Sequence, residues 1–156
     1  MAATVVERLK PVTTNLLEYD ETNLIEELGR RGKALQLDFA EMGNPAMEVI
    51  DDPKLLGPID EIRDLGLQIA KRWIKELQKV VCSADSADKA EREKIQSALK
   101  LEGSDLAAAV AVFLVSTFFV ASPIAAVVAA IVVKRLGGSA LEEICKKSDE
   151  WIKQMG

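Results

Sequence analysis

Acidic side chains and two cysteines are the residues of this 156-residue chain that could do chemistry. Asp60 and Asp64 lie one helical turn apart, and paired carboxylates can bind a metal or transfer protons. The sequence contains no histidine, which excludes Ser-His-Asp and Cys-His catalysis and histidine metal sites. Di-metal helical bundles need a Glu-x-x-His motif. We therefore interpret the carboxylates as solvated helix starts, which the helix dipole favours, and predict no catalytic residue, no metal and no cofactor.

Cys82 and Cys145 are the two cysteines. The N-terminus lacks a basic region followed by an apolar stretch, so it does not resemble a secretory signal. Two cysteines in a chain without an export signal are more often reduced core thiols than a disulfide, and we expect reduced thiols here. We expect a cytoplasmic protein, either free or associated with a membrane.

The charge balance and the missing motifs restrict the partners. The chain has 20 Lys and Arg against 25 Asp and Glu, a net charge of −5, whereas nucleic-acid binding needs a basic surface. Glycine-rich phosphate loops, Cys-x-x-Cys pairs and Gly-x-Ser-x-Gly elbows do not occur. We therefore expect neither a nucleic-acid partner nor a small-molecule substrate, and we predict that the protein is not an enzyme.

The elements that position these residues are helices. Apolar side chains recur at helical spacing through most of the chain. Pro11 should break or kink the first segment, and Asn23 is a plausible N-cap. Gly29 and Gly32 weaken their helix or let another helix approach closely. The predicted helical segments are 3–17, 24–42, two short turns within 43–58, then 58–81, 88–101, 105–121, 123–136 and 139–154. We predict one all-α domain, residues 1–156, of about seven or eight helices.

The most informative segment is Leu106 to Val133, 28 consecutive residues without a charge. As one helix it would be about 42 Å long, against roughly 30 Å for the hydrocarbon core of a bilayer. Ser122-Pro123 is typical of a helix start, and the residue before a proline disfavours helix. We therefore predict a hairpin of two apolar helices, 105–121 and 123–136, each shorter than a comfortable membrane span.

The predicted hairpin contains three sets of candidate site residues: membrane contacts, packing residues and flanking basic residues. The large apolar side chains are candidates for contact with a membrane: Leu106, Val110, Phe113, Leu114, Phe118, Phe119, Pro123, Ile124, Val127, Val128, Ile131 and Val132. Alanines spaced at four residues let the two helices pack closely: Ala107, Ala111, Ala121, Ala125 and Ala129. Lys134 and Arg135 end the run, as basic residues that flank a membrane segment do and as those at any helix end do.

Two functions remain open. The layout, with amphipathic helices 1–104 and 139–154 around a hydrophobic hairpin, resembles that of pore-forming colicin domains and of apoptosis-regulating helical bundles. The uncharged run from Leu106 to Val133 leads us to expect a non-enzymatic, membrane-active protein, an effector or pore former, whose hairpin docks in or inserts into a bilayer. The alternative is a soluble interaction or scaffolding module with the hairpin buried in its core or in a homo-oligomer interface. The partner is then membrane lipid or a protein, with a second copy of the chain as one option.

Overall fold

The computed structural model describes residues 3–37, 57–82, 89–98, 100–101, 103–136 and 141–154. Within these ranges the chain forms seven α-helices and no strand, so the predicted all-α fold is confirmed. The helices are α1 (Ala3–Leu16), α2 (Glu21–Leu37), α4 (Ile59–Cys82), α5 (Lys89–Ala98), α6 (Gly103–Phe118), α7 (Ser122–Leu136) and α8 (Leu141–Gln154). The two short helical turns predicted within 43–58 fall almost entirely outside the described residues, as do Ser139 and Ala140 of the last predicted helix.

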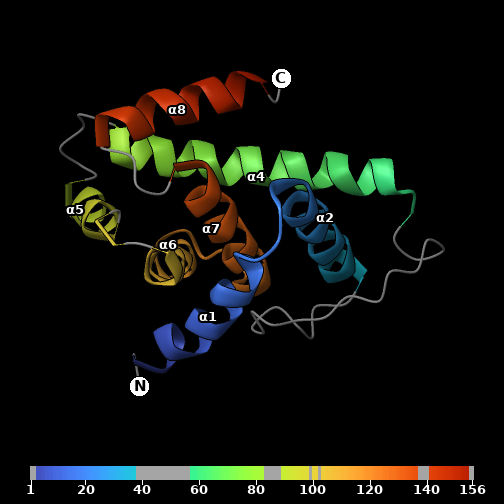
Figure 1. Ribbon diagram of the computed structural model, residues 1–156, viewed down its shortest axis with the longest axis horizontal. Coiled ribbons are helices and arrows are strands. Elements are labelled where there is room, and N and C mark those ends of the chain that lie inside the picture. The colour runs from blue at the N-terminus through green and yellow to red at the C-terminus, as the bar shows by residue number, and fades with distance from the viewer. Residues whose placement is uncertain are drawn as a thin grey trace.

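Helix α7 is the centre of the molecule (Figure 1). It contacts α1, α2, α4, α6 and α8, and the side chains from Val127 to Ile131 have no exposed surface. A helix that is apolar on all faces is stable in water only when neighbours cover every face. The amphipathic helices supply these neighbours with their own apolar stripes, of which Leu24, Leu28 and Ile74 are buried members.

Helices α6 and α7 form the predicted hairpin, but α6 ends at Phe118 rather than at residue 121, and residues 119–121 connect the two helices. Phe119 has a left-handed backbone, with φ of 57°, which turns the chain at the end of α6. The backbone N–H of Val120 donates to the carbonyl of Leu114 at 3.2 Å, which satisfies one carbonyl of the last turn. The left-handed region costs an L-residue about 1–2 kcal/mol, so a bulky aromatic is an unusual occupant of this position.

Glycines bring α2 and α4 into backbone contact. A Cβ atom added at Gly29 would overlap the carbonyl oxygen of Ile62, and one added at Gly66 would overlap the carbonyl oxygen of Ile25. The same added atom at Gly66 would lie 3.2 Å from the backbone nitrogen of Gly29. Of the two alternatives predicted for Gly29, a weakened helix or a close approach by another helix, the structure shows the close approach. The two helices cross where neither carries a side chain.

The N-cap predicted at Asn23 was wrong. Helix α2 begins at Glu21 rather than after Asn23, because the Asp20 carboxylate accepts a 2.7 Å hydrogen bond from the Asn23 backbone N–H. Aspartate caps helices as well as asparagine does, so the cap three residues earlier extends the helix. Of the two outcomes expected at Pro11, a break does not occur, because helix α1 continues through Pro11 to Leu16.

Candidate functional site

The structure buries most of the hairpin residues that the sequence offered as membrane contacts. Ten of these side chains are buried: Leu106, Val110, Phe113 and Leu114 in α6, and Pro123, Ile124, Val127, Val128, Ile131 and Val132 in α7. Phe118 is half-buried and Phe119 is 88% exposed. The hairpin therefore contacts other helices along its length and presents an aromatic side chain at its tip.

The small residues of the hairpin are mostly buried, and its two basic residues are exposed. Ala107, Ala111, Ala125 and Ala129 are fully buried in the helices, whereas Ala121 is half-buried in the connection. Lys134 is exposed. The Arg135 guanidinium binds the Glu21 carboxylate at 2.7 Å and lies over the Trp151 ring, 5.4 Å from its centroid. Arg135 thus joins α7 to α2 and α8.

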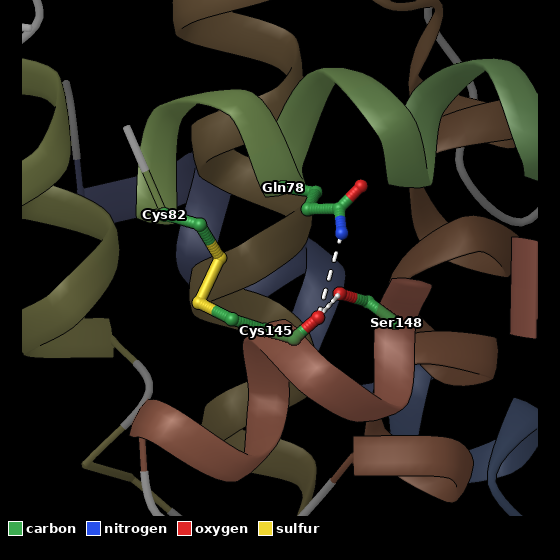
Figure 2. Close-up of a disulfide and its surroundings, with 4 residues drawn as sticks. All are labelled: Gln78, Cys82, Cys145 and Ser148. Carbon is green, nitrogen blue, oxygen red and sulfur yellow. Dashed lines mark hydrogen bonds between the residues drawn. A yellow bond between two sulfur atoms is a disulfide. The ribbon is translucent and has the colours of Figure 1, made fainter. Parts of the chain in front are cut away.

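Cys82 and Cys145 form a disulfide, so the expectation of reduced core thiols was wrong. Helices α4 and α8 lie side by side and bring the two Cα atoms to 5.9 Å (Figure 2). Cys82 is exposed and Cys145 half-buried, so neither is the fully buried thiol that the sequence suggested. The Cys145 carbonyl accepts hydrogen bonds from the Gln78 amide at 3.4 Å and the Ser148 hydroxyl at 3.1 Å. The disulfide encloses α5, α6 and α7 in one covalent loop.

The hairpin tip forms one wall of a groove, which we call the tip groove. Its volume is about 670 Å³. Helices α2, α4 and α7 and the 119–121 connection supply its lining, which is mostly apolar: Gly32, Leu35, Leu65, Gln68, Ile69, Arg72, Trp73, Phe119, Val120, Ala121 and Ile124. Among the described residues that line it, Arg72 is the one with an ionisable side chain. The tip groove therefore suits an apolar side chain better than a charged substrate.

Aromatic and charged contacts hold the walls of the tip groove. Trp73 stacks on Phe118 with ring centroids 6.1 Å apart, and Phe118 meets Phe113 edge to face at 5.5 Å. The Arg72 guanidinium lies 4.7 Å from the centroid of the Trp73 ring. These contacts tie α4 to α6 directly beside the exposed Phe119. A fixed wall lowers the entropic cost of binding a partner there.

The sequence did not reveal the tip groove. Leu65, Ile69 and Trp73 belong to the apolar stripe of the predicted 58–81 helix, where each looks like a core residue, but the structure leaves all three half-buried. The available signal was the pair Phe118-Phe119 a few residues before Ser122-Pro123, which places two aromatic residues close to the predicted turn.

Two kinds of site were sought among the described residues, a metal-binding cluster and a membrane-spanning helix. No group of three or more Cys, Asp or Glu side chains in the described ranges is arranged to hold a metal ion. None of the helices described is both long enough and apolar enough to cross a bilayer. No protein-family model, curated protein or solved structure matches this chain.

Proposed function

We propose that this chain is a non-enzymatic protein-interaction module, in which the hydrophobic hairpin is the core of the bundle and the tip groove is the binding surface. The observation that carries the proposal is the complete burial of Val127 to Ile131 by protein. Of the two functions that the sequence left open, this burial favours the interaction module.

The energetic argument concerns the helices around the hairpin. Burying a Leu or Val side chain contributes about 1.5–3 kcal/mol, so α7 gains little by exchanging protein for lipid. Leaving the bundle would expose the stripes of α1, α2 and α4 that now cover α7, including Leu9, Leu28 and Ile74. Insertion of the hairpin therefore carries a net cost.

The disulfide supports the same proposal. The disulfide joins α4 to α8, and α5, α6 and α7 lie between these two helices in the sequence. While the bond is intact, the hairpin therefore cannot move far from both helices. The competing membrane-active function has one observation in its favour, the exposed aromatic side chain of Phe119.

Hydrogen exchange of the oxidised full chain tests the proposal, with and without vesicles of neutral and anionic lipid, at neutral and mildly acidic pH. We expect the amides of α7 to stay protected in every condition, since α7 remains the core. Flotation on the same vesicles reports membrane binding separately. Loss of α7 protection together with flotation would show that the hairpin inserts, and would overturn the proposal.

A further inference from the structure

We propose that the tip groove receives Phe119 of a second copy of this chain, so that the protein forms a two-fold symmetric homodimer. This inference rests on the proposed function, which makes the tip groove a protein-binding surface. It adds the identity of the partner and the geometry of the contact.

The first argument is that a projecting side chain and a groove lie on one face. Phe119 is 88% exposed, and it borders the groove of about 670 Å³ that Leu65, Ile69 and Trp73 also line. In a two-fold interface each copy offers the same patch, so a residue and its neighbouring groove can be exchanged reciprocally. A phenylalanine that enters an apolar pocket beside a tryptophan is a typical interface anchor.

The second argument is the charge pattern of α4 beside the groove. Six exposed side chains recur at intervals of three or four residues and form one stripe, which we call the α4 stripe: Glu61, Asp64, Gln68, Arg72, Lys75 and Lys79. Its first two residues are acidic, and its last three are basic. Gln68 and Arg72 belong to both the stripe and the lining of the tip groove, so the two features form a continuous surface.

When two α4 helices run antiparallel, the acidic end of each α4 stripe lies opposite the basic end of the other. With the two-fold axis at Gln68, Asp64 of each copy faces Arg72 of the other. The same axis places Glu61 opposite Lys75. A parallel arrangement would instead oppose like charges, which is destabilising. The axis that pairs the charges also passes beside the tip groove, so the charge pairs and the exchange of Phe119 belong to one arrangement.

The α4 stripe also favours a second copy over a bilayer. An anionic membrane would attract Arg72 and Lys75 but repel Glu61 and Asp64, which lie on the same face. A neutral bilayer has no group to pair with either set. A protein surface with the reverse order of charges satisfies both, and the antiparallel α4 stripe is such a surface.

Sedimentation equilibrium of the oxidised full chain tests the dimer, with Phe119→Gly as the first variant. Glycine removes the projecting ring and suits the left-handed backbone, so the monomer should fold at least as well as before. We expect the dimer dissociation constant to rise at least about tenfold, as for loss of a central interface anchor. Circular dichroism of dilute protein checks that the helical content is unchanged.

Two charge reversals test the symmetry. Asp64→Arg alone opposes two arginines, and Arg72→Asp alone opposes two aspartates, so each variant should be mainly monomeric. An equimolar mixture of the two should form a heterodimer, because both contacts then join opposite charges. In one chain these residues are eight positions, or about 12 Å, apart along α4, so no contact within the chain could produce this rescue. Lys146→Asp on α8 is the matched control and should leave the dimer intact.

Three results would overturn the inference. One is a wild-type chain that stays monomeric up to its solubility limit. Another is a dimer unaffected by Phe119→Gly and by both charge reversals, which would place the interface elsewhere. The third is a monomer that floats with vesicles only when Phe119 is present, which would make the tip a lipid contact. Each of these leaves the proposed burial of α7 to be judged separately by hydrogen exchange.

Discussion

The Arg31 guanidinium of α2 donates a 2.9 Å hydrogen bond to the carbonyl oxygen of Pro123, the second residue of α7. Arg31 is only 5% exposed, and its Nε donates to the Glu27 carboxylate at 2.8 Å. Residues 92 positions apart are thus joined at the start of the most buried helix. A buried arginine is tolerated when its charge is paired and its N–H groups are bonded, and this one holds the hairpin tip against α2.

Arg31→Met should lower the free energy of unfolding by about 2–3 kcal/mol, because it removes charge-assisted hydrogen bonds and leaves the Pro123 carbonyl without this donor. Urea denaturation followed by circular dichroism measures the change. Lys134→Met, which also removes a positive charge but at an exposed position, should change stability by less than about 0.5 kcal/mol. Equal effects of the two variants would contradict a structural role for Arg31.

Gly29→Ala should destabilise the fold by more than about 2 kcal/mol, although alanine is the better helix former by about 1 kcal/mol. The added methyl group overlaps the backbone carbonyl of Ile62, which cannot move without shifting α4. Gly32→Ala is the matched control in the same helix, because its methyl group crowds only the flexible end of the Ile69 side chain, makes an ordinary contact with Leu65 and meets no backbone atom of α4. The wild type and Gly32→Ala should therefore have similar melting temperatures, and Gly29→Ala should melt at a lower temperature than both.

Loss of the disulfide in the double variant Cys82→Ser, Cys145→Ser should cost up to about 4 kcal/mol, the chain-entropy value for a loop of this length. The melting temperature of the wild-type chain should fall on addition of a dithiol reductant, whereas that of the double variant should not respond. Thiol titration of the unfolded, unreduced protein checks the bond directly. Two free thiols per chain in the wild type would show that the pair is not joined.

Val127→Asp should prevent folding, because it places an unpaired carboxylate where the side chain has no contact with water. Loss of soluble expression and of helical circular dichroism is the expected result. Ser116→Asp, at an exposed position of α6 in the same hairpin, should fold normally. A Val127→Asp protein that keeps its fold and loses only membrane binding would instead support the membrane-active function.

Local patterns along the chain are enough to predict the helices and the hairpin. The spacing of apolar residues in 58–81 predicts a helix with one covered face. The uncharged run from Leu106 to Val133 predicts two apolar helices that need cover from their neighbours. The Ser122-Pro123 pair located the turn to within a few residues, since local backbone preferences act there. These features depend on residues close together in the chain.

The long-range contacts, in contrast, could not be predicted from these local patterns. The Cys82–Cys145 pairing depends on α4 and α8 lying side by side, and the meeting of Gly29 with Gly66 depends on where α2 crosses α4. Phe119 is as apolar as the half-buried Phe118 beside it, yet it is exposed at the point where its left-handed backbone turns the chain. Such outcomes follow from how whole helices pack against one another, which the spacing within any one helix does not specify.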